Sequence, residues 1–326
     1  MTDRTTRART EFRGFRAGDG PPLVAAWCRS APADPVSADR FRSQVLLDAD
    51  FDPAGLRVAV EDGRLVGAAY AVRRLTPPAG TDLEPEQGWV PFFFVDPEAR
   101  GRGVGRGLLT DALGWLGGHG RTRVDFAPYT PNYFLPGLDA ERYPEAAGLL
   151  ESLGFRTLYE AVAMDRCLTG YAFPAEAGQR AAELTGRGYR FGTPADDDLP
   201  GLLALAAHHF TPDWARAIRE ALLRGAPLER IVVVHDPSDR PVGWAMHGAY
   251  ESVTERFGPF GVLDELRGAG LGEVLLHLVL ERMRALGADS AWFLWTGERS
   301  PAGRLYRRAG FATTRVFRVL RREGAR

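Results

Sequence analysis

Apolar and polar positions along the first half of the chain predict a series of strands and helices. Residues 57–72 form two apolar, β-rich runs around the turn Glu61-Asp62-Gly63, which predicts a hairpin. Residues 89–95 form an apolar strand. After a glycine-rich turn, apolar residues recur at helical spacing and predict a helix over about 103–116. Further predicted elements are a strand at 123–126, a helix at 143–153 and a closing strand at 155–165.

The same pattern returns in the second half of the chain. The segment from Val95 aligns with the segment from Val262 without a gap, and eleven positions are identical. The second set of predicted elements comprises a hairpin at 231–248, a strand at 256–263, a helix at 270–286, a strand at 290–296, a helix at 301–309 and a closing strand at 311–320. A repeat at domain length indicates two related domains rather than a solenoid. We therefore expect an N-terminal domain over 1–170, a linker region over 171–187 and a C-terminal domain over 188–326. Each is of mixed α/β class, with antiparallel hairpins before a strand–turn–helix unit.

The composition suits two soluble domains. The chain has 326 residues, of which 45% are hydrophobic and 25% charged, and its formal net charge is −1. This balance provides no basic field for nucleic acid or an anionic membrane. No run of about 18 apolar residues could span a membrane, and the polar segment 1–16 does not resemble a secretory signal. We therefore expect a cytoplasmic protein.

All 41 basic residues are arginine. The absence of lysine excludes a pyridoxal-phosphate enzyme, which needs a Schiff-base lysine. It also excludes P-loop NTPases and protein kinases, which need a phosphate-binding lysine. The six histidines form no HExxH pattern, so we expect no metal site. Cys28 and Cys167 lie far apart, which favours free thiols.

Two glycine-rich turns are the main candidate binding features. Both fit Arg-x-x-Gly-x-Gly before a helix, and we call Arg100–Gly105 the first loop and Arg267–Gly272 the second loop. Glycines let several backbone N–H groups point to one place, and a helix start adds unpaired donors and a positive dipole end. Such a loop suits a pyrophosphate. Leu108 and Leu275 occupy the position of the third glycine of a dinucleotide-binding turn, so that alternative fails.

Both loops resemble the acyl-CoA pyrophosphate loop of the GNAT superfamily of N-acyltransferases. The hairpin, the helix after the loop and the terminal Gly-Phe pairs also match that family, and the layout is similar to tandem GNAT proteins of the mycothiol synthase type. The resemblance implies two tandem GNAT-like domains, each with a mostly antiparallel central sheet flanked by helices, and acetyl-CoA as the acyl donor. The implied donor-binding residues are Val95, Arg100, Gly101, Arg102, Gly103, Val104, Gly105, Arg106, Val262, Arg267, Gly268, Ala269, Gly270, Leu271 and Gly272.

The resemblance also implies direct transfer of an acetyl group to a primary amine. The amine must lose a proton to a base, a backbone N–H of the strand before the loop can stabilise the thioester oxygen, and the departing thiolate benefits from a proton donor. In this family a tyrosine before the Gly-Phe pair is that donor. Tyr306 matches it, whereas Leu150 stands at the position in the first copy. Tyr306 is also consistent with a purely structural core tyrosine.

The base and the acceptor site are less well defined. Glu255 is the first candidate base; Glu298 and His247 are alternatives, and both carboxylates could simply be solvated. In the first copy, Tyr133 and Phe134 lie in an aromatic, proline-rich loop at 129–139 that could bind substrate or pack between the domains. Either Tyr133 or Tyr143 could replace the missing donor there.

Three hypotheses follow. In the first, the C-terminal copy catalyses N-acetylation and the N-terminal copy binds CoA. In the second, the N-terminal copy is catalytic and its aromatic loop shapes the acceptor pocket. In the third, the protein is a non-catalytic acyl-CoA-binding module. The expected partner is a small-molecule or peptide amine, with no nucleic acid and no membrane, and the protein is expected to be a monomer or a homodimer.

Overall fold

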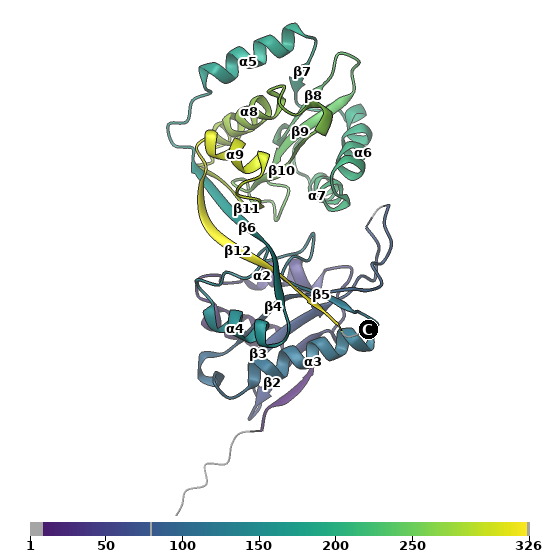
Figure 1. Ribbon diagram of the computed structural model, residues 1–326, viewed down its shortest axis with the longest axis vertical. Coiled ribbons are helices and arrows are strands. Elements are labelled where there is room, and N and C mark those ends of the chain that lie inside the picture. Colours follow the sequence, from purple (N-terminus) through teal and green to yellow (C-terminus); the bar gives the residue numbers. More distant parts are fainter. Residues whose placement is uncertain (1–8, 79, 325–326) are drawn as a thin grey trace, which may run out of the picture. The chain divides into compact units, whose positions relative to one another are not determined.

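The computed structural model describes residues 9–78 and 80–324, and these residues form two compact units (Figure 1). The first unit contains the chain up to Pro77, Asp82–Glu160 and the chain from Phe317 onward. The second is built on Ala161–Val316. Each unit is of the mixed α/β class, which confirms the predicted fold class.

A sheet with antiparallel pairing for most of its width forms the centre of the first unit. Its strands are β1 (Glu11–Gly14), β2 (Leu56–Glu61), β3 (Arg64–Val72), β4 (Gln87–Val95) and β5 (Arg123–Phe126), in that order. Only β4 and β5 run parallel to each other. The predicted hairpin is present as β2 and β3. Asp62 and Gly63 both have positive φ in its turn, as a two-residue hairpin that follows the twist of the strands requires.

Helices of the first unit pack around this sheet. Leu108, Leu109, Ala112 and Leu116 line the buried side of α3 (Val104–Gly118), which lies against β2, β3 and β4. The predicted helix at 143–153 is α4 (Pro144–Ser152). The sequence pattern had not predicted α1 (Gly20–Ser30), α2 (Ala38–Phe41) or the π-helical turn Arg42–Leu46 that follows. Together, α3 and its neighbours close the core that supports the first loop.

The second unit repeats this plan with a four-stranded antiparallel sheet. Its order is β10 (Phe257–Val262), β9 (Pro241–His247), β8 (Ile231–His235) and β7 (Arg190–Gly192). The fifth strand, β11 (Ser290–Thr296), forms no ladder with β10 in the described residues; an isolated parallel bridge joins its Trp292 to Arg256, the residue before β10. The helices are α6 (Leu199–His209), α7 (Pro212–Leu223), α8 (Leu271–Ala285) and α9 (Pro301–Arg308). Short 3-10 turns lie at Pro97–Ala99, Asp196–Asp198, Leu228–Arg230 and Asp264–Leu266.

The closing strand of each copy extends into the unit formed mainly by the other copy. Strand β6 (Arg156–Cys167) pairs with β11 within the second unit, from Val162 to Cys167. Strand β12 (Ala312–Glu323) pairs with β5 within the first unit, from Leu320 to Glu323. The compact units therefore do not follow chain order, unlike the expected domains 1–170 and 188–326. Each strand is twelve residues long; its first five residues are mostly exposed, and its buried residues lie further along the strand.

The expected linker region contains a helix. Helix α5 (Ala175–Gly186) packs against α8. Ala177 and Leu184, two turns apart, are its buried residues, and a spacing of seven places them on one helix face. The polar composition of 171–187 had hidden this narrow apolar stripe. As a result, α5 brings side chains to the second unit that the repeat comparison did not include.

Replacing Leu320 with alanine should destabilise the first unit, although Leu320 is encoded at the end of the second copy. Its side chain is almost fully buried and belongs to the core around Leu108 and Leu116. Loss of a buried leucine costs about 2–5 kcal/mol. Urea unfolding followed by hydrogen exchange should show faster exchange in α3. Val316→Ala, at a half-exposed position of the same strand, is the matched control and should change stability by less than about 0.5 kcal/mol. Faster hydrogen exchange in α8, with hydrogen exchange in α3 unchanged, would contradict the placement of the end of β12 in the first unit.

Candidate functional site

In each unit, two parallel strands separate just before the glycine loop. In the first, β4 and β5 pair only from Gln87–Arg123 to Val90–Phe126, and β4 then continues five residues to Val95 without β5. In the second, Trp292 N–H donates to Glu255 O at 2.9 Å, after which β10 runs on to Val262. The separation leaves backbone groups of β4 and β10 unpaired on one side, where a ligand can bind between the strands.

The first loop directs unpaired backbone amides outward. Gly101 and Gly103 have φ of 73° and 88°, and Gly103 caps α3 in the left-handed conformation. A Cβ added at either glycine would meet nothing within 4 Å, so the space in front of this loop is open. Within the described residues, six successive backbone N–H groups of this segment have no hydrogen-bond acceptor: those of Gly101, Arg102, Gly103, Val104, Gly105 and Arg106. This arrangement fits the pyrophosphate of a CoA thioester.

The arginines of the first loop fasten it in place. Arg100 donates through Nε to Val95 O at 3.1 Å and through a terminal nitrogen to Ser30 O at 2.8 Å. Arg102 donates to Glu98 O at 3.0 Å and pairs with Glu61 at 2.9 Å. Arg106 donates to Ser152 Oγ at 2.9 Å. The amides therefore remain available to donate to an anion, and the guanidinium groups hold the loop and add positive charge nearby.

The second loop has the same backbone but a different environment. Gly268 and Gly270 have φ of 83° and 93°, and Gly270 caps α8. Ala269 N–H already donates to Leu266 O at 3.3 Å. Within the described residues, the N–H groups without an acceptor are those of Gly268, Gly270, Leu271, Gly272 and Glu273. Arg267 pairs with Asp264 at 2.5 Å.

Tyr306 lies where β10 and β11 separate. Its ring centroid is 5.8 Å from that of Phe257 and 6.1 Å from that of Phe260, both on β10, and 4.5 Å from that of Phe293 on β11. Helix α9 holds it there, with Phe311 behind it at 5.7 Å. Burial raises the pKa of Tyr306 well above its usual value, so the phenol stays protonated at physiological pH.

Leu150 occupies the equivalent place in the first unit. It is fully buried in the core that contains Phe126 and Phe155, the counterparts of Phe293 and Phe311. Tyr143, one suggested substitute donor, gives its hydroxyl proton to Asp34 Oδ2 at 2.6 Å. The structure thus places a tyrosine between the separating strands of the second unit and a leucine at that point in the first.

The candidate bases differ in their surroundings. Glu255 lies two residues before β10, at the end where β10 and β11 are still joined, and its carboxylate raises the proton affinity of nearby His247. Glu298 is exposed and pairs with Arg307 at 2.9 Å. His247 is fully buried, its Nδ1 lies 2.9 Å from Thr254 O, and burial lowers its pKa to about 4. A histidine with that pKa is a weak base at neutral pH.

The aromatic loop of the first copy belongs to the core of its own unit. Phe134 packs against Trp27 at 4.9 Å and Phe92 at 5.6 Å between ring centroids. Tyr133 is also buried, and the hydroxyl of Tyr129 donates to buried Asp48 and Asp50. Tyr133 and Phe134 therefore present little surface to an acceptor. The loop thus packs onto α1 and β4 of its own unit, which neither expectation from the sequence had included.

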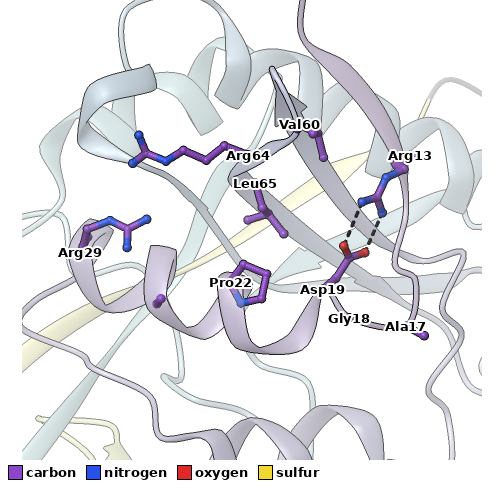
Figure 2. A pocket seen from close by; sticks show the side chains of 11 residues that line it. Arg13, Ala17, Gly18, Asp19, Pro22, Arg29, Val60, Arg64 and Leu65 are labelled. Atoms are coloured by element: carbon purple, nitrogen blue, oxygen red, sulfur yellow. Dashed lines mark hydrogen bonds and ion pairs between the residues drawn. The ribbon is translucent and has the colours of Figure 1, made fainter.

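A pocket of about 510 Å³ lies beside β1, α1 and the β2–β3 turn in the first unit. Figure 2 shows Arg13, Arg29 and Arg64 around it, with Arg13 bonded to Asp19. Arg29 and Arg64 both reach buried Asp96 next to the first loop, at 2.7 and 3.0 Å. Burial opposes ionisation of Asp96, but the hydrogen bond and charge of Arg29 and the charge of Arg64 outweigh it and lower its pKa. These arginines thus brace the strand end before the first loop.

Neither a metal cluster nor a membrane span is found within residues 9–78 and 80–324. No group of three or more histidine, cysteine, aspartate or glutamate side chains could hold a metal ion there. In the same residues, no helix is long and apolar enough to cross a membrane.

Comparison with known proteins decides the family. The sequence model of the acetyltransferase (GNAT) family matches residues 24–133 and 199–311, which together are more than half of the chain. The chain belongs to the GNAT acetyltransferase family. It is accordingly an acetyltransferase, and its family uses acetyl-CoA as the acyl donor. Each half of the chain contains one family match, as the sequence repeat had predicted.

Several known proteins are also similar to this chain over nearly its whole length. It is 28% identical over 300 residues to the mycothiol acetyltransferase of Clavibacter michiganensis subsp. michiganensis, covering 88% of this chain and 86% of that protein. A GCN5-related N-acetyltransferase from Sphaerobacter thermophilus has a TM-score of 0.71 at 19% identity, with 97% of both chains covered. A tandem GNAT protein from the clavulanic acid biosynthesis pathway gives 0.64 at 16%, covering 98% of this chain and 99% of that one.

A fourth similar protein is much longer than this chain. It is the fungal multi-domain GH3 β-N-acetylglucosaminidase with a GCN5-related glucosamine N-acetyltransferase region, with a TM-score of 0.81 at 19% identity. The match covers 98% of this chain but 39% of that protein. At these identities, the solved structures establish the shared fold.

The second unit should lose stability in mild acid. Burial lowers the pKa values of His247 and His277 to about 4, below the value of about 6.5 for an unfolded histidine. The unfolded chain therefore takes up protons first as the pH falls, and stability present above pH 6.5 is lost down to about pH 4. Between pH 7 and 5 we expect a loss of at most about 2 kcal/mol for each histidine.

Urea unfolding at pH 7 and pH 5, read by hydrogen exchange in β9 and α8, measures this loss. Arg230, Arg282 and Glu255 surround His247, and Arg166 lies near His277, where Tyr171 hydroxyl and His277 Nδ1 are 2.8 Å apart. The double variant His247→Gln, His277→Gln should flatten the pH dependence. An equally steep pH dependence in that variant would refute the assignment.

Proposed function

We propose that the second unit transfers the acetyl group of acetyl-CoA to a primary amine in a ternary complex, and that the first unit binds CoA without catalysing transfer. The observation that carries this proposal is the position of Tyr306 against both separating strands, where the first unit has Leu150. Both units have glycine loops suited to the pyrophosphate. Only the second joins such a loop to a phenol between the strands.

The separated strands and the loop would orient the donor. Bound acetyl-CoA supplies the thioester carbonyl carbon, which forms a C–N bond to the amine as its C–S bond breaks. Amides of the second loop hold the pyrophosphate, and an unpaired N–H of β10 stabilises the negative charge that develops on the carbonyl oxygen. Holding both reactants in line supplies much of the rate enhancement. No covalent enzyme intermediate is required.

Tyr306 would act on the departing thiolate by hydrogen bonding. Its pKa is raised by burial, whereas a thiol has a pKa of about 8.5. Full proton transfer from Tyr306 to the sulfur is therefore uphill, but a protonated phenol in an apolar site remains a good hydrogen-bond donor. The proton that finally neutralises the sulfur comes from the amine by way of the base and solvent.

We assign the base to Glu255. It lies at the end where β10 and β11 are still joined. Glu298, by contrast, is paired with Arg307, and His247 is a weak base. Glu255 is only half-buried, so a water molecule can relay the proton from the amine. This assignment keeps the proton acceptor at one end of the separation and the pyrophosphate loop at the other.

We propose a small-molecule amine as the acceptor. The chain resembles the mycothiol acetyltransferase along both halves and with similar coverage of the two proteins, which favours an acceptor of the kind that such an enzyme acetylates. The balanced charge of the chain supports no polyanionic acceptor. Burial of Tyr133 and Phe134 argues against an acceptor pocket at the aromatic loop of the first unit.

Tyr306→Phe should reduce kcat by about 10- to 100-fold with little change in KM for acetyl-CoA, because only the hydroxyl that stabilises the leaving thiolate is lost. Release of free CoA thiol across a panel of amines, including an amino sugar, an amino acid and a peptide N-terminus, measures it. Leu150→Met at the equivalent position is the matched control and should keep full turnover. Loss of activity in Leu150→Met, with Tyr306→Phe active, would instead make the first unit catalytic.

A further inference from the structure

The two glycine loops differ in charge. Residues 96–106 carry three arginines against Asp96 and Glu98, a formal charge of +1. Residues 263–273 carry Arg267 against Asp264, Glu265 and Glu273, a formal charge of −2. An anion at the second loop therefore meets like charge from its own segment, and Arg267 is already paired with Asp264. If the second loop holds a pyrophosphate, a cation from another element would offset this repulsion.

Helix α5 provides such a cation. If Gly270 carried a Cβ, the three nearest atoms would be Cδ, Cγ and Nε of Arg180, at 2.6, 2.9 and 3.1 Å. Gly101 and Gly103 of the first loop have nothing within 4 Å at the same test. The side chain of Arg180 thus lies directly on the glycine that caps α8, among the amides without an acceptor.

Arg180 can also exchange its present partner for an anion. Its side chain is half-exposed, and one terminal nitrogen contacts Glu183 Oε2 at 2.6 Å, one turn further along α5. An exposed ion pair of this kind contributes little to stability, so exchange of the carboxylate for a phosphate costs little. A guanidinium offers several donors in one plane and can contact a phosphate while the loop amides contact another of its oxygens.

We propose that Arg180 is a pyrophosphate-binding residue of the second loop and offsets the negative charge of that segment. This inference rests on the proposed function, since it takes the second loop to be a CoA site. It predicts that the two loops bind CoA by different means. The first uses its own arginine-rich segment, and the second depends on a residue 90 positions earlier in the chain.

Hydrogen exchange of the full chain with and without CoA tests the two loops separately. In the wild type, CoA should protect the amides of 101–106 and of 268–273. Arg180→Ala should weaken the CoA dependence of protection at 268–273 by about 10- to 100-fold and leave that at 101–106 unchanged. Arg187→Ala, which removes a charge from the end of α5 where it lies over Tyr189, is the matched control and should leave both unchanged.

Further variants and a second ligand sharpen the test. Glu183→Gln frees Arg180 and should keep or strengthen protection at 268–273. With 3′-dephospho-CoA, Arg180→Ala should cause the same loss, because the pyrophosphate is retained; a loss confined to intact CoA would overturn the assignment to the pyrophosphate.

Unchanged or stronger protection at 268–273 in Arg180→Ala would overturn the proposal, the second result meaning that Arg180 covers the loop against CoA. Failure of the proposed function looks different, because wild-type amides at 268–273 would then gain no protection from CoA at all.

Discussion

The first N–H groups of a helix cannot be satisfied within the helix, and this constraint organises both units. Gly103 and Gly270 adopt the left-handed conformation at the start of α3 and α8, which turns several such groups toward one place outside the protein. The strand before each loop ends beside this place. Its parallel neighbour no longer pairs with it there, so the backbone groups of its last residues are unpaired on that side. Arg100 and Arg102 donate to carbonyl and carboxylate oxygens, and these contacts hold the first loop in this shape.

On this shared frame, the two copies have diverged in the chemistry around it. The first has a basic loop segment, an aromatic core that includes Phe134, and Leu150 between its strands. The second has an acidic loop segment, Arg180 on the glycine that caps α8, and Tyr306 between its strands. Under the proposed function, the first loop retains its CoA and the second releases CoA after each turnover. This proposed division of tasks gives a reason for two similar loops in one chain.

Local patterns predicted much of this arrangement. The glycine loops, the hairpins and the helices at 104–118 and 271–285 follow from short-range spacing, and the repeat identified Tyr306 and Leu150 as counterparts. The family was predicted from the same residues and is confirmed by matches in both halves. The roles of Tyr306, Glu255 and the loop residues stay predictions. Contacts between residues far apart in the sequence leave no such local pattern. Nothing in the apolar pattern of 311–320 indicates that Leu320 joins the core around Leu108, and α5 is too polar to stand out from a linker, so Arg180 was missed.

The central claim is that the loop amides bind the diphosphate of the acyl donor, and calorimetric titration tests it most directly. The chain should be titrated with acetyl-CoA and, in parallel, with S-acetylpantetheine, which carries the same thioester without the diphosphate and the 3′-phosphoadenosine attached to it. The account predicts measurable heat of binding with acetyl-CoA, affinity that falls as salt is raised, and at least a hundredfold weaker binding of S-acetylpantetheine, because several charge-assisted hydrogen bonds are absent. Equal binding of the two ligands, or no binding of acetyl-CoA, would contradict it.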